Sequence, residues 1–141
     1  MVWHREQAVM AWRFKLRHAY VLKRPEFEGK HFKSQWCKLE NGELTIRPQY
    51  CWDGCSPAIP LPFGFWVGTP DGSLCDDGRP QAYYASLVHD VFCQYHETIP
   101  LTKEEVSTIF YDMLRFRGFS PFRAAVYKFA VTTFGPQSWG V

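Results

Sequence analysis

The sequence lacks any long hydrophobic run. No apolar stretch approaches the roughly 18 residues that suggest a membrane-spanning helix. The opening MVWHREQAVM also lacks the apolar core of a secretory signal. We therefore expect no membrane span and a protein that stays in the cytosol unless it is packaged into a particle. Apolar residues are still plentiful, because 46% of the 141 residues are hydrophobic and 18% are aromatic. This composition is typical of a folded domain and excludes disorder through low hydrophobicity.

Charge of one sign is also scarce. Lys and Arg number 16 and Asp and Glu 14, which leaves a formal net charge of +2. Acidic and basic residues are interspersed along most of the chain. Such a balance gives no electrostatic argument for nucleic acid or for an anionic membrane surface. We therefore expect no nucleic acid partner.

The sequence has five cysteines, an odd number, and it has no Cys-x-x-Cys pair. Cys51 and Cys55 lie four residues apart in a glycine-containing segment, but no second pair completes a zinc-ribbon pattern. Without a secretory signal, free thiols are favoured over a disulfide framework. We predict that all five thiols are reduced.

The first half of the chain has the pattern of short strands, over residues 11–47, after an N-terminal extension of residues 1–10. Its clearest feature is Asn41-Gly42, the dipeptide that supplies both positive-φ residues of a type I′ hairpin turn. The flanking strands are predicted over residues 35–39 and 44–47. Residues 11–16 and 19–22 are weaker strand candidates.

Prolines and glycines interrupt the chain over residues 48–80. Loops of this length are uncommon in compact domains and are usually functional or disordered. Four large aromatic side chains favour an ordered loop that wraps onto the body of the protein, and they are Trp52, Phe63, Phe65 and Trp66. We therefore predict a long ordered loop in this segment.

Apolar residues recur at helical spacing over residues 81–135. The pattern predicts three helices, at about residues 81–95, 102–117 and 120–134. Thr102 and Glu105 have the spacing of a capping box, and Ser120-Pro121 places a capping residue before a first-turn proline.

The third helix is apolar around most of its circumference. Phe122, Val126 and Phe129 lie on one side, and Tyr127 and Val131 add apolar surface on the other. We therefore predict that this helix is deeply buried. Strands followed by helices indicate a single α+β domain, in which a small antiparallel sheet packs against three helices.

The densest group of polar residues lies on the first helix. At 3.6 residues per turn, the stripe opposite its apolar face carries Ser86, His89, Cys93 and His96. Asp90 lies about a third of a turn from His89. The plainest interpretation is that this stripe meets water. The small size of Ser86 and Cys93 favours the alternative, in which another segment covers it, and residues 48–80 are the obvious candidate.

Three kinds of chemistry are open to this stripe. His89 and Asp90 could bind a divalent metal ion and activate water. His89 could instead act as a general base that a carboxylate orients. Both residues could also hold the loop by hydrogen bonds without any catalysis. The spacing of His89, Cys93 and His96 is also compatible with a zinc site along one helix face.

Within residues 48–80, the run WDGCSP at positions 52–57 stands out. An Asp beside Gly, followed by Ser-Pro, is typical of a turn in which the carboxylate caps backbone amides. The functional interpretation places Asp53 and Ser56 against His89. The candidate catalytic residues are therefore Asp53, Ser56, His89 and Asp90, and the last two are also the candidate metal ligands.

At these residues the chain resembles a phage and prophage family known as domain of unknown function 1353. The resemblance covers about residues 39–139. Four pieces carry it in order, namely YCWDGCSP at 50–57, ASLVHD at 85–90, TKEE at 102–105 and FGPQSW at 134–139. Many relatives carry an Asp near Ser107, whereas here only Asp112 supplies one. The family name carries no activity, so the resemblance implies a phage origin and a location in the host cytoplasm or the virion.

A second resemblance concerns the order of the polar residues. His31, then His89-Asp90, then Asp112 is similar to the ligand order of the His-Asp metal phosphohydrolases. Those proteins are all helical, whereas His31 precedes a predicted hairpin strand. The predicted fold therefore disagrees with this second family.

Two functions follow as hypotheses. The first is a small hydrolase with Asp53, His89 and Asp90 at its site, in a form that works either with or without a divalent metal ion. The second is a non-enzymatic phage protein, either a tail or neck component of the virion or a factor that binds a host protein. Aromatic residues near the chain ends favour binding, because aromatics are enriched at interface cores. The expected partners are phage structural or host proteins, and the sequence leaves the oligomeric state open.

Overall fold

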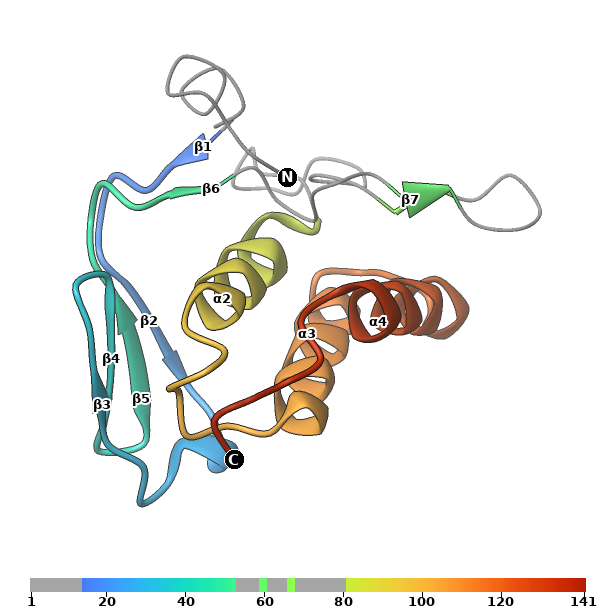
Figure 1. Cartoon of the computed structure of the whole chain (residues 1–141). Coiled ribbons are helices and arrows are strands. Elements are labelled where there is room, and N and C mark those ends of the chain that lie inside the picture. Colours follow the sequence, from blue (N-terminus) through green and yellow to red (C-terminus); the bar gives the residue numbers. More distant parts are fainter. Residues whose placement is uncertain (1–13, 53–58, 61–65, 68–80) are drawn as a thin grey trace, which may run out of the picture. The chain divides into compact units, whose positions relative to one another are not determined.

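The computed structural model describes residues 14–52, 59–60, 66–67 and 81–141 (Figure 1). The chain divides into two compact units, Met1–Asp53 and Gly54–Val141, and each is described by itself. An antiparallel sheet in the first half and helices in the second half confirm the predicted α+β class. The predictions for residues 1–10 and for most of the loop at 48–80 fall outside the described residues.

The main sheet has the strand order β2-β5-β4-β3, and neighbouring strands are antiparallel. Its strands are β2 (Tyr20–Lys23), β3 (Phe32–Lys33), β4 (Cys37–Glu40) and β5 (Glu43–Ile46). A short 3-10 helix, η1 (Pro25–Phe27), follows β2. Asn41 and Gly42 join β4 to β5 with φ angles of 54° and 76°. These two positive angles confirm the predicted hairpin turn.

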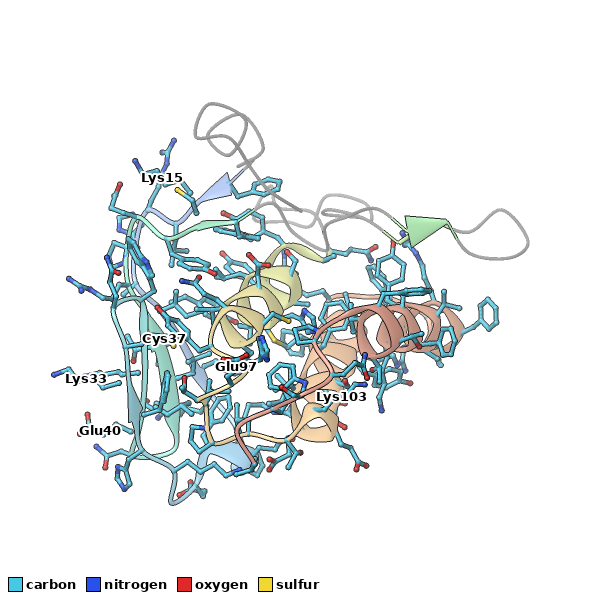
Figure 2. All side chains as sticks on the ribbon, viewed as in Figure 1. Lys15, Lys33, Cys37, Glu40, Glu97 and Lys103 are labelled. Carbon is cyan, nitrogen blue, oxygen red and sulfur yellow. The ribbon has the colours of Figure 1, made fainter. Side chains whose placement is uncertain are left out.

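One face of this sheet is buried and the other is exposed. Cys37 and Leu39 of β4 are buried, and they alternate with the exposed Lys38 and Glu40. Figure 2 shows Lys33 and Glu40 extending from the face opposite to Cys37. This period of two is what a strand with one buried face requires, because successive side chains point to opposite faces.

Two shorter ladders accompany the main sheet. β1 (Phe14–Lys15) pairs with β6 (Cys51–Trp52), and β7 (Ile59–Pro60) pairs with β8 (Trp66–Val67). The last three of these strands lie within residues 48–80, which the sequence predicted as a loop. Each is two residues long, so it offers no alternation for a sequence pattern to reveal.

The helices begin and end close to the predicted positions. They are α2 (Tyr83–Gln94), α3 (Lys103–Phe116) and α4 (Pro121–Phe134). The predicted capping box is confirmed, because Glu105 N donates to Thr102 Oγ1 at 3.0 Å and Thr102 N donates to Glu105 Oε1 at 2.9 Å. Gly118 follows α3 with a φ of 106°, a left-handed conformation that favours glycine after a helix end. Ser120 caps α4 by accepting from Arg123 N at 3.2 Å.

The predicted deep burial of α4 holds for only one of its sides. Its buried side chains are Ala124, Tyr127 and Ala130, which belong to a cluster with residues of α3. The side that carries Phe122 and Phe129 is exposed instead, since these side chains are 63% and 60% exposed. Both sides of α4 are apolar, so periodicity alone could not identify the buried one. The small Ala side chains let α3 and α4 lie close together (Figure 1).

Among the described residues, none of the helices combines the length and the apolar character that a bilayer crossing requires.

Candidate functional site

The structure places two of the four predicted catalytic residues. His89 and Asp90 lie in the middle of α2, where both are partly buried. Asp53 and Ser56 fall outside the described residues. The predicted contact between their loop and His89 therefore stays a prediction.

The polar stripe of α2 is partly covered by another helix. The ring of His89 lies 5.0 Å from the ring of Phe110 on α3, with an interplanar angle of 51°. Ser86 is buried, and its hydroxyl donates to the carbonyl of Tyr83 at 2.8 Å. The stripe is therefore not simply a solvated face, although His89, Cys93 and His96 keep partial exposure. A covering segment was the alternative, and α3 supplies at least part of that cover.

His89 and Cys93 contact each other one helical turn apart. Cys93 Sγ lies 3.5 Å from Nδ1 and 3.7 Å from Nε2 of His89. Burial lowers the pKa of His89 from 6.5 to about 4. The imidazole is therefore neutral at pH 7, and a base of this strength is poorly matched to proton transfer near neutral pH.

Cys93 does not have the character of a catalytic thiol. Burial, and secondly the negative charge of Asp90, raise the pKa of Cys93 to about 12. Activated cysteines have a lowered pKa, because the thiolate is the nucleophile. Cys93 therefore stays protonated at neutral pH, and the His89–Cys93 pair is a packing contact with weak polar character.

His96 has a different environment from the rest of the stripe. Its Nδ1 donates to the carbonyl of Ser138 at 2.7 Å, and its ring lies 5.8 Å from the ring of Trp139. His96 thus ties the segment after α4 to the end of α2. In the part of the chain that the structure describes, no three His, Cys, Asp or Glu side chains form a group that could hold a metal ion. The zinc spacing of His89, Cys93 and His96 is therefore not realised as a site.

The residues that follow the ligand order of the His-Asp metal phosphohydrolases do not all lie on helices. His31 precedes β3 in the first unit and lies on no helix, while Asp112 lies in α3 of the second unit. An open hollow lies beside His31 and is lined by side chains of β3 and β4, including Lys33, Lys38 and Glu40. Lys38 and Glu40 approach each other at 3.6 Å across its exposed wall. This hollow is shallow and charged, unlike the mostly apolar concave sites that bind small molecules.

The feature that the sequence analysis missed is the outward face of α4. It consists of Phe122, Ala125, Val126, Phe129 and Thr133, which share one side of the helix at 100° per residue. Val126 is partly buried and the other members are exposed. This face carries no charged residue. The signal in the sequence was present, since these positions follow a helical period, but the same helix offers a second apolar side.

Basic side chains lie on both edges of this outward face. The guanidinium carbon of Arg123 lies 4.3 Å from the ring centroid of Phe119 and 5.7 Å from that of Tyr127. On the other edge, Lys128 Nζ lies 5.8 Å from the ring centroid of Tyr111 on α3. These cation–π contacts hold the two charges beside the apolar face.

Comparisons with known proteins add no functional information. A comparison with protein-family models finds no match, and comparisons with curated proteins and with solved structures also find none. The resemblance to the phage family therefore stays a prediction. Any function has to be argued from the geometry alone.

Proposed function

We propose that this chain is a non-enzymatic binding protein, and that the outward face of α4 is its docking surface. The observation that carries the proposal is the exposure of Phe122 and Phe129, at 63% and 60%, on a helix whose opposite side is buried. Single exposed apolar residues are ordinary on protein surfaces. Two phenylalanines on one helix face, with Ala125 and Val126 between them, form a continuous patch instead.

The size of the patch supports this function. Phe122 and Phe129 are 63% and 60% exposed. A phenylalanine side chain offers about 200 Å², so these two residues of the outward face together expose on the order of 250 Å². Apolar patches of a few hundred Å² on a monomer are often functional.

The spacing within the patch supports the same function. Phe122, Val126 and Phe129 have the i, i+4, i+7 spacing by which one helix anchors on a protein partner. The partner classes that the sequence suggested, a phage structural protein or a host protein, are compatible with such an anchor. The hydrolase hypothesis has less support, because a pKa of about 4 makes His89 a weak base that is poorly matched to proton transfer near neutral pH.

Site-specific photo-crosslinking tests the docking function. Ala125 lies between the two phenylalanines and is exposed, so a benzoylphenylalanine placed there should crosslink to a bound partner. We expect one defined adduct in cells where the chain acts. This adduct should disappear in the Phe122→Ser/Phe129→Ser double variant. The same probe at Lys38, exposed on the sheet of the other unit, is the matched control. No adduct from position 125, or the same adduct from position 38, would contradict the proposal.

A further inference from the structure

The charges around α4 are one-sided. Asp112 is the last acidic residue of the sequence, and residues 113–141 contain four basic residues and none that is acidic. The four are Arg115, Arg117, Arg123 and Lys128. The near-neutral total charge of the chain hides this separation. Two of these residues, Arg123 and Lys128, border the outward face of α4. A partner that docks on α4 therefore meets one basic residue on each edge of an uncharged apolar stripe.

Arg123 and Lys128 stand where they can select a partner. Both are held over aromatic rings of the same unit, at 4.3 Å from the ring centroid of Phe119 and 5.8 Å from that of Tyr111. The two charges are therefore already positioned before binding. Less side-chain entropy is then lost when a partner supplies the opposite charge.

The shape of the surface favours a helical partner. α4 has 14 residues and is therefore about 21 Å long. Its outward face is a convex ridge with phenylalanines at Phe122 and Phe129, two turns apart. A second helix can pack along such a ridge when it has its own apolar stripe. The edges of that stripe would then lie opposite Arg123 and Lys128.

These observations exclude a second copy of the chain as the preferred occupant. Two α4 faces packed together would bring Arg123 and Lys128 of both copies close, with no acidic residue of α4 to compensate. Like charges placed opposite each other at an interface cost several kcal/mol. Nucleic acid fits poorly as well, because the centre of the face has no basic group to contact phosphates.

We propose that the outward face of α4 binds an amphipathic helix of another protein, in which acidic residues border the apolar stripe. This inference rests on the proposed docking function and adds the chemistry of the partner. Apolar contact with Phe122 and Phe129 supplies the affinity. Acidic groups opposite Arg123 and Lys128 supply the choice between partners.

Two synthetic helices test the inference with the full-length chain. One peptide carries Leu on its apolar stripe and Glu on both edges, and the other carries Leu with Lys at the same positions. We expect the Glu peptide to bind at least about 10-fold more tightly, which corresponds to about 1.4 kcal/mol. Its affinity should fall several-fold between about 0.05 and 0.5 M salt, because salt screens exposed charges. Fluorescence anisotropy of labelled peptides measures both effects.

Three variants separate the contributions. Arg123→Gln/Lys128→Gln should reduce the preference for the Glu peptide to less than about 3-fold and leave binding of the Leu stripe in place. Phe122→Ser/Phe129→Ser should abolish binding of both peptides. Lys33→Gln/Lys38→Gln removes two exposed charges from the sheet of the first unit and should change neither affinity. Circular dichroism melting confirms that each variant is folded.

The outcomes separate two claims, namely that the partner is an acidic helix and that the outward face of α4 is a docking surface. Equal binding of both peptides, abolished by the phenylalanine variant, would overturn the acidic partner and keep the docking surface. Failure of both peptides to bind would overturn the docking function as well. Vesicles of phosphatidylserine and of phosphatidylcholine form the last arm. Binding to anionic vesicles without binding to the Glu peptide would overturn the inference in favour of a membrane surface.

Discussion

His89 is held as a neutral ring between a thiol and an aromatic ring. It contacts Cys93 on its own helix and Phe110 on α3, and both contacts suit an uncharged imidazole. Burial accounts for its lowered pKa, because burial disfavours the charged form. His89 therefore gains its proton only in acid, and it stays neutral near pH 7.

The free energy of unfolding should therefore fall in acid, because the folded chain keeps His89 neutral while the unfolded chain protonates it. Its pKa is about 4 in the folded chain against an ordinary 6.5, so the unfolded chain binds the proton first. The free energy of unfolding is unaffected above pH 6.5 and decreases as the pH falls toward 4, by up to about 3 kcal/mol. Urea denaturation at pH 7 and pH 4.5 measures this loss. His89→Gln should remove that part of the pH dependence, while His31→Gln, at an exposed histidine, should keep it. Identical pH profiles for His89→Gln and the parent chain would contradict the assignment.

The thiol of Cys93 should react more slowly in the folded chain than in the unfolded chain. With a pKa of about 12, the thiolate is a minute fraction at pH 8. We expect iodoacetamide to alkylate Cys93 at least about 10-fold more slowly in the folded chain than in urea. Asp90→Asn should accelerate the folded-state reaction, because it removes the second cause of the raised pKa. Glu97→Gln, at an exposed acid after the same helix, serves as the control. Peptide mass spectrometry gives the rates, and an unchanged rate in Asp90→Asn would refute the role of its charge.

At the scale of the elements, α3 begins where its capping residues predict. Thr102 and Glu105 satisfy each other's backbone amides at the start of α3. Thr102→Ala should lower the free energy of unfolding by about 1 kcal/mol, because it leaves an amide of the first turn without its side-chain acceptor. Thr133→Ala, at an exposed position of α4, should stay within about 0.5 kcal/mol of the parent chain. Chemical denaturation of both variants makes the comparison, and equal losses would count against the cap.

α4 provides the clearest test of which side a helix buries. Phe122→Ser/Phe129→Ser should leave the free energy of unfolding within about 1 kcal/mol of the parent, because both side chains are already exposed. Tyr127→Ala should lower it by about 3 kcal/mol or more, since Tyr127 is buried and packs edge-on against Phe119 at 5.1 Å. Thermal melting ranks the variants. The reverse order would show that the sequence-based prediction for α4 was right after all.

For the whole molecule, the separation of charge should control self-association. Exposed phenylalanines on α4 favour contact between copies, while the surrounding basic residues oppose it. We expect a monomer at low ionic strength in sedimentation velocity. Reversible association should appear in about 1 M ammonium sulfate, where charges are screened and apolar burial is strengthened. Phe122→Ser/Phe129→Ser should stay monomeric in both buffers. A stable dimer at low salt would argue against the repulsion between copies.

The candidate site was less predictable than the fold. The sequence placed His89 and Cys93 on one stripe of a helix, with Asp90 about a third of a turn away, and the structure confirms that His89 and Cys93 touch. The lowered pKa of His89 and the raised pKa of Cys93 depend on burial, which a helical period does not report. Asp53 and Ser56 lie outside the described residues, so their part of the hypothesis stays a prediction.

Local interactions explain what the sequence determined by itself. The Asn41-Gly42 turn, the Thr102–Glu105 box and the Ser120 cap involve residues within three positions of one another. Their geometry is therefore encoded in short stretches of chain. The α+β class follows from the same local patterns, added along the sequence.

Only the tertiary structure decided which side of α4 is buried and what covers the polar stripe of α2. Both depend on contacts between residues far apart in sequence, such as His89 with Phe110 and the cluster that joins Ala124 and Tyr127 to α3. An apolar residue on an apolar helix has the same local preference on either side. Close packing against α3 favours the side with Ala124 and Ala130, because small side chains let the helices approach. Phe122 and Phe129 are left on the outside, where the proposed function places a partner.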